Sequence, residues 1–128
     1  MKLRTLMIIN TIVAIVFGLS FIIIPTQVYS LYDITADEQL IYMARLFGTA
    51  LIGFGILTWM ARNATDSDAR KAIVLALFIA DSIGFVVALL GQLSNVVNAV
   101  GWSTVAIYLL LALGFGYFQF FKAASSQE

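Results

Sequence analysis

Four long apolar stretches limit the fold of this chain more than any other feature. A helix that crosses a hydrocarbon core of about 30 Å needs about 20 mostly apolar residues. Residues 3–24, 38–62, 70–93 and 100–121 have this character, and the first stretch stops at Pro25, the one proline of the chain. Proline cannot continue a helix. The pattern predicts an all-α integral membrane protein with one transmembrane domain over residues 1–128, folded as an up-down-up-down four-helix bundle.

Composition supports a membrane protein and excludes several classes of chemistry. The chain is 62% hydrophobic and 11% charged, whereas soluble domains are about 45–50% apolar and about 25% charged. Its formal net charge is zero, which gives no reason to expect a nucleic-acid partner. It has no cysteine and no histidine, which removes thiolate and imidazole metal ligands and the commonest general base. We therefore expect no catalytic site, no metal and no cofactor.

The placement of lysine and arginine predicts an orientation. Basic residues concentrate in the cytoplasmic loops of membrane proteins. The loop between the first two spans is acidic, with Asp33, Asp37 and Glu38, and the loop between the last two has no charge. The basic residues at or beyond the ends of the spans all fall on the other side: Lys2, Arg4, Arg62, Arg70, Lys71 and Lys122. This predicts a multi-pass protein of the cell membrane with both termini in the cytoplasm.

Polar segments beside the spans predict where helices begin. Thr35-Ala36-Asp37-Glu38 matches a capping box with Thr35 as N-cap and Glu38 at the third position, so a helix should begin near Ala36. Residues 65–68 offer a similar cap before the third span. Residues 28–34 are expected to lie along the outer membrane surface.

Small residues predict where the helices pack. In lipid, helices associate through small side chains that let two backbones approach closely. The chain has such residues at helical spacing in three spans, in line with Asn10 in the first span and with Asp81 in the third: Ala14, Gly18, Ala44, Gly48, Gly55, Gly84 and Ala88. We expect these residues to form the seams of a bundle whose interior holds the polar groups.

Arg45 and Asp81 are the two ionisable side chains more than one turn inside the ends of the spans, apart from tyrosine. Each costs at least about 2.5–3.5 kcal/mol at a helix centre on insertion scales. In one arrangement Arg45 pairs with Asp81, which relieves the desolvation of both. In the other, Arg45 reaches toward the outer interface, and Asp81 stays near the midplane with Asn10 as its partner. Such residues either fix helix register or bind a ligand.

Neighbouring polar residues extend this set. Thr49 lies one turn below Arg45 on the same face and would continue a polar pocket inward. Tyr108 is expected to be an interior hydrogen-bond partner of Arg45, and Asp37, Glu38 and Asn98 are alternative partners at the outer interface. Asn10 is expected to join helices through a hydrogen bond rather than to contact a ligand.

One motif carries a family resemblance. Ala44-Arg45-Leu46-Phe47-Gly48 spells A-R-x-F-G near the outer start of the second span, and it resembles the ergosterol-biosynthesis scaffold protein family. The layout of spans also resembles uncharacterised small four-span membrane proteins. The scaffold family consists of small four-span proteins that tether enzymes without being catalytic, so the resemblance implies a non-enzymatic accessory role.

These observations give two functional hypotheses. The first is a non-enzymatic scaffold or accessory subunit that lies in the lipid bilayer and binds other membrane proteins or copies of itself. The alternative is an oligomeric transporter or channel for a small solute or ion, or a lipid-ligand binder, that uses Arg45 and Asp81. An acid–base enzyme is a third, less favoured, class because no recognised catalytic motif is present.

Overall fold

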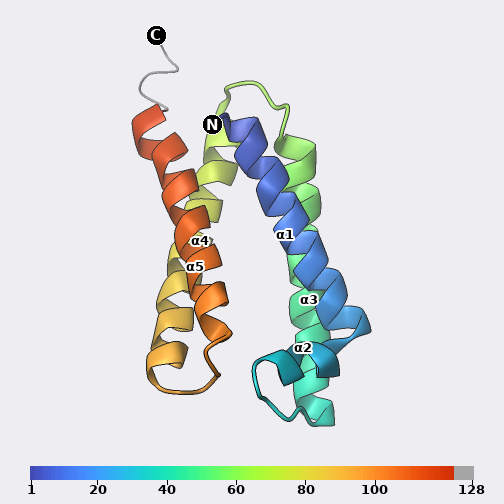
Figure 1. The fold of residues 1–128 in the computed structure, drawn as a ribbon. Coiled ribbons are helices and arrows are strands. Elements are labelled where there is room, and N and C mark those ends of the chain that lie inside the picture. Colours follow the sequence, from blue (N-terminus) through green and yellow to red (C-terminus); the bar gives the residue numbers. More distant parts are fainter. Residues whose placement is uncertain (123–128) are drawn as a thin grey trace. The chain divides into compact units, whose positions relative to one another are not determined.

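The computed structural model describes residues 1–122, and these residues are almost entirely helical (Figure 1). The elements, in chain order, are α1 (Leu3–Ile23), α2 (Pro25–Leu31), α3 (Glu38–Ala61), α4 (Asp68–Leu93), α5 (Gly101–Gly116) and the π-helical η1 (Tyr117–Lys122). No strand occurs within residues 1–122. The predicted all-α class is therefore confirmed.

Four helical segments are long and apolar enough to cross a membrane: Leu3–Ile23, Glu38–Ala61, Asp68–Leu93 and Gly101–Phe121. Their ends lie within two residues of the four apolar stretches. Only 17% of the apolar window of α3 or α4, and 28% of that of the other two, is buried. Large apolar surfaces of this kind are unfavourable in water and favourable in lipid tails, so the helices indicate a multi-pass membrane protein.

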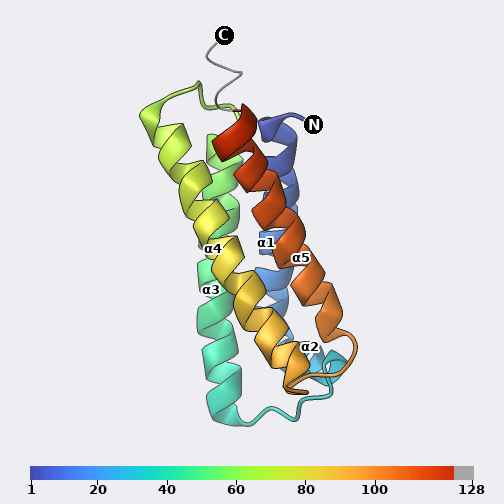
Figure 2. The same cartoon turned by 90° about the vertical axis from the view of Figure 1, so that its left-hand side faces the viewer.

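The chain divides into two compact units. The α1–α3 unit consists of Met7–Arg62, and the α4–α5 unit consists of Met1–Leu6 with Asn63–Glu128. Helices α1 and α3 lie side by side in the first, and α4 and α5 lie side by side in the second (Figures 1 and 2).

The break between α1 and α2 follows from Pro25. Ile24 leaves the helical conformation, with φ −128° and ψ 52°, and Pro25 takes the first position of α2. Proline suits that position because its missing N–H is not needed there. Helix α2 buries Pro25 and Val28, and the turn that follows places Asp33 at φ 61°. The segment expected along the membrane surface is therefore the end of a short helix and a turn.

Helix α3 begins later than the capping box predicted. Its N-cap is Asp37, whose carboxylate accepts the N–H of Leu40 at 2.8 Å, and Glu38 is its first residue. The prediction of Thr35 as N-cap was wrong. Aspartate caps a helix as well as threonine does, and its charge also interacts favourably with the positive helix end. Helix α4 is capped within the expected segment, by the hydroxyl of Ser67, which accepts the N–H of Arg70 at 3.2 Å.

Helices α1 and α3 approach closely at glycines. A Cβ added to Gly48 would lie 2.6 Å from the carbonyl oxygen of Gly18, and one added to Gly18 would lie 2.9 Å from that of Gly48. Two turns after Gly48 in α3, a Cβ added to Gly55 would lie 2.7 Å from the side chain of Ile15. Ala14 and Ala44 are buried as well. Any larger side chain at Gly18 or Gly48 would push the two backbones apart.

Helices α4 and α5 form an antiparallel hairpin (Figure 2). The ring of Tyr108 packs on Gly84, where an added Cβ would lie 2.4 Å from the ring. The ring of Phe78 packs on Gly116, where an added Cβ would lie 2.9 Å from the ring. Residues 94–100 connect the helices, with Asn95 at φ 58°. The side chain of Gln92 donates to the carbonyl oxygen of Asn98 at 3.1 Å and stabilises this connection.

Candidate functional site

Arg45 is held by the end of a neighbouring helix. Its Nε donates a hydrogen bond to the carbonyl oxygen of Ile22, at 3.2 Å. Ile22 lies in the last turn of α1, where carbonyl groups lack partners within the helix. Pro25 adds to this deficit because it has no N–H to offer the carbonyl of Phe21. A cationic donor at a helix C-terminus is favourable for both reasons.

This partner was not among those expected from the sequence. The expected partners of Arg45 were all side chains. The sequence signal for a main-chain carbonyl is Pro25, which ends α1 beside Arg45 of α3. Arg45 belongs to the α1–α3 unit and Asp81 to the α4–α5 unit, so the expected Arg45–Asp81 pair stays a prediction.

Aromatic side chains surround the end of α1. Phe21 packs edge-on against Tyr29 of α2, with 6.2 Å between ring centroids, and its ring is tilted against that of Phe47 of α3, with 5.4 Å between centroids. The hydroxyl of Tyr29 donates to the carbonyl oxygen of Leu40 at 3.4 Å, and burial raises the pKa of this hydroxyl. These contacts fix α2 against α3 and define the surroundings in which Arg45 meets Ile22.

Thr49 does not reach beyond its own helix through its hydroxyl, as far as the structure describes its contacts. The hydroxyl donates to the carbonyl oxygen of Arg45 at 3.0 Å, and the residue is exposed. A threonine in a membrane helix often satisfies itself in this way. The contact supplies no support for a polar pocket that extends inward from Arg45.

Asn10 takes part in a polar contact between α1 and α3. Thr58 is fully buried, and its hydroxyl lies 2.8 Å from that of Thr11 and accepts a hydrogen bond from Asn10 Nδ2 at 3.4 Å. The sequence analysis missed Thr58 and Thr11. Thr58 follows Gly55 by three residues, so the helical spacing of the small residues could have placed it on the same seam.

Asp81 is buried in α4, with 8% of its surface exposed. Its Oδ2 has no hydrogen-bond partner among the described residues. Ala88, two turns after Asp81 in α4, is partly buried, and the ring of Tyr108 packs against Gly84. The face of α4 expected to hold the polar group therefore does pack, and it leaves one carboxyl oxygen without a donor.

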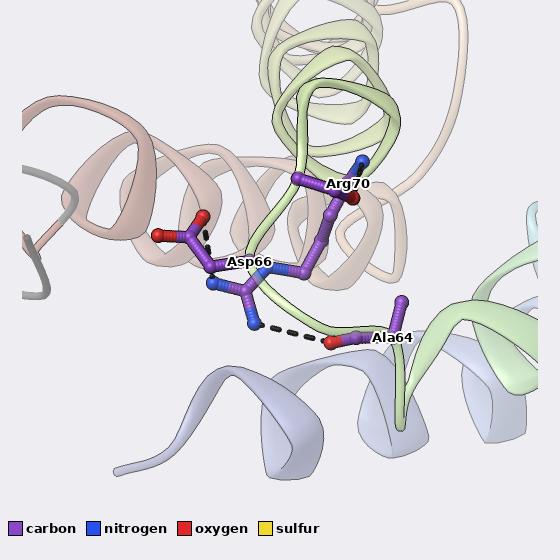
Figure 3. Close-up of polar contacts among 4 residues, drawn as sticks. Ala64, Asp66 and Arg70 are labelled. Atoms are coloured by element: carbon purple, nitrogen blue, oxygen red, sulfur yellow. Dashed lines mark hydrogen bonds and ion pairs between the residues drawn. The ribbon is translucent and has the colours of Figure 1, made fainter.

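The loop between α3 and α4 has its own network of polar contacts. Arg70 forms an ion pair with Asp66 at 3.2 Å and donates to the carbonyl oxygen of Ala64 at 3.2 Å (Figure 3). Arg4 donates to the side chain of Asn63 at 2.8 Å. At the end of α3, the guanidinium carbon of Arg62 lies 3.5 Å from the centre of the Trp59 ring. These contacts order the most basic end of the helices.

Mostly exposed apolar helices of spanning length, with a few polar side chains inside the spans, define the class of small multi-pass α-helical membrane proteins. The chain belongs to the family described as "Domain of unknown function (DUF8292)", which matches residues 1–120. No curated protein and no solved structure matches the chain.

Proposed function

We propose that the protein is a non-enzymatic scaffold or accessory subunit of the membrane, which binds other membrane proteins or copies of itself by helix packing. The observation that carries the proposal is that Gly53 in α3 and Gly91 in α4 have open space beside them. A Cβ added to either one would meet no atom within 4 Å among the described residues.

The other glycines behave differently. At each of these seven positions, an added Cβ would come closer than 3.0 Å to a neighbouring atom: Gly18, Gly48, Gly55, Gly84, Gly101, Gly114 and Gly116. Glycine lowers helix stability unless a close approach needs it. Two glycines without such a neighbour in the chain are positions where a helix from another chain can approach.

Each open glycine also has small exposed residues on its own side of the helix. Gly53 follows exposed Ala50 by three residues, and Gly91 shares one side of α4 with exposed Ala76 and Ala80. In lipid, small side chains on an outer face let a second helix come close enough for van der Waals packing. The A-R-x-F-G resemblance to the ergosterol-biosynthesis scaffold proteins supports the same function.

The proposal includes an arrangement in the membrane. The four spans form an up-down-up-down bundle, and both termini lie in the cytoplasm. The support is the contrast between the basic end, with Arg62, Arg70 and Lys71, and the acidic turn with Asp33 and Asp37 at the other ends of the helices.

Enlarging the open glycines tests the proposal. The protein is purified in mild detergent from its native membrane, and co-purifying chains are identified by mass spectrometry. Gly53→Leu and Gly91→Leu should lose the partner and keep the monomer fold, because leucine fills only the space reserved for the partner. Val86→Leu, which also enlarges an exposed residue of α4, should keep the partner. A wild-type protein that is monodisperse and free of partners in every native extract contradicts the proposal.

Lipid-ligand binding is a second candidate, and the observation that favours it is the exposure of Arg45. Its Nε donates to the carbonyl oxygen of Ile22, so the guanidinium is held at the C-terminal end of α1, where an anionic head group is a suitable ligand. Native mass spectrometry with anionic and zwitterionic lipids should then show retained anionic lipid in the wild type and none in Arg45→Gln. Liposome flux assays on Arg45→Ala and Asp81→Asn test the related transporter or channel hypothesis, which wild-type flux in both variants would contradict.

A further inference from the structure

Asp81 lies on the face of α4 that packs against α5. Phe78, one turn before it, contacts Gly116 of α5, and Gly84, one turn after it, contacts Tyr108. Asp81 is midway between these two contacts, so its side chain is directed at the middle of α5 and not at the exposed face.

The residues of α5 that follow Tyr108 have no side chain that can donate a hydrogen bond. Residues 109–116 read LLLALGFG, and Leu111 and Ala112 are buried. Residues 111 and 112 are opposite Asp81, because residue 78 is paired with 116 and residue 84 with 108. Within α4, the neighbouring hydroxyl of Ser82 donates to the carbonyl oxygen of Phe78 at 2.7 Å.

The contacts of Asp81 agree with this apolar setting. Less than a tenth of the residue is exposed, and Oδ2 has no hydrogen-bond partner among the described residues. In α5 and η1, which pack against α4, the titratable residues are Tyr108, Tyr117 and Lys122; the other charged residues of α4 are Asp68, Arg70 and Lys71, all in or near its first turn. A carboxylate ion in apolar surroundings is unfavourable when one of its oxygens has no donor, and such a group becomes neutral instead.

We propose that Asp81 is a proton-binding site inside the membrane and holds its proton at neutral pH. The ligand of the site is a proton, and the protonated carboxyl group can donate a hydrogen bond or pass the proton to an acceptor that comes within reach. This role is independent of the scaffold function, which uses the open glycines on other positions of α3 and α4.

A hydrophobic carbodiimide tests the proposal, because it reacts with protonated carboxyl groups in apolar surroundings. The carboxyl O–H adds across one C=N bond to give an O-acylisourea, and the acyl group then migrates to nitrogen. The N-acylurea contains all atoms of both reactants, so nothing leaves. Wild-type protein in phospholipid nanodiscs is treated with dicyclohexylcarbodiimide at neutral pH and digested, and the adduct is located by tandem mass spectrometry.

The expected result is an adduct on Asp81, its loss in Asp81→Asn, and its retention in the control Asp66→Asn, which changes a carboxyl group of the α3–α4 loop. A water-soluble carbodiimide with an added amine should instead modify the carboxyl groups outside the spans. The infrared band of a protonated carboxyl group should be present in the wild type and lost in Asp81→Asn. An adduct confined to carboxyl groups outside the spans, or an infrared spectrum without that band, overturns the proposal, and both wild-type measurements decide it even where the variant does not fold.

Discussion

Arg45 Nε donates to the carbonyl oxygen of Ile22 at 3.2 Å, so a side chain of α3 closes the C-terminal end of α1. The contact explains why an arginine is found inside an apolar helix. Its cost in the membrane is offset where another helix ends at a proline and offers an unpaired carbonyl group. Arg45 thus has a structural role in the α1–α3 unit before any ligand is considered.

The first prediction separates the hydrogen bond from the charge. Glutamine Nε2 and the terminal methyl group of methionine both stand at the position of arginine Nε along the side chain, and only glutamine donates. Arg45→Met should lower the free energy of unfolding by about 1 kcal/mol, the usual net value of a hydrogen bond, whereas Arg45→Gln should be close to wild type. Reversible unfolding in mixed micelles measures both. An equal loss in the two variants would show that the Ile22 contact does not stabilise the fold.

The second prediction concerns the glycine contact between α1 and α3. Gly48→Ala should destabilise the protein by about 1–3 kcal/mol, the usual cost of overpacking, because the added Cβ meets the main-chain oxygen of Gly18, which cannot rotate away. Gly53→Ala is the matched control on the same helix and should be neutral or slightly stabilising, since its Cβ meets no described atom within 4 Å. The same unfolding measurement compares them. If the two variants have equal stability, the close approach of Gly18 and Gly48 is not required.

The sequence predicted the long helices well but misplaced one helix cap and missed several hydrogen-bond partners, and each outcome has a physical reason. The ends of the four long helices follow closely from hydropathy and Pro25, because a membrane span has one requirement that dominates all others. The N-cap of α3 was misplaced because Thr35 and Asp37 are both good caps within three residues, and local pattern does not decide between them. The partners of Arg45 and Asn10 were missed because a main-chain carbonyl has no sequence signature and because the hydroxyl of Thr58 resembles an ordinary self-satisfied threonine.

A third prediction follows from the buried hydroxyl of Thr58. Thr58→Val keeps the shape and removes the contacts with Thr11 and Asn10, so it should cost about 0.6–1.7 kcal/mol, the range measured for hydrogen bonds between membrane helices. Thr49→Val makes the same chemical change on the same helix, but its hydroxyl donates only within α3, so it should be almost neutral. Equal effects of the two substitutions would assign the loss to the hydroxyl itself and not to the contact between helices.

A fourth prediction tests the orientation, and the absence of cysteine from the chain makes it simple. Thr35 and Thr65 are both exposed and lie in the turns before α3 and α4, so a single cysteine at either position should leave the spans intact. In intact cells, a membrane-impermeant maleimide should label Thr35→Cys, because the acidic turn lies outside. It should label Thr65→Cys only after lysis, since the basic loop is predicted to lie in the cytoplasm. The reverse pattern would invert the proposed topology, and labelling of both from outside would mean that α3 does not cross the membrane.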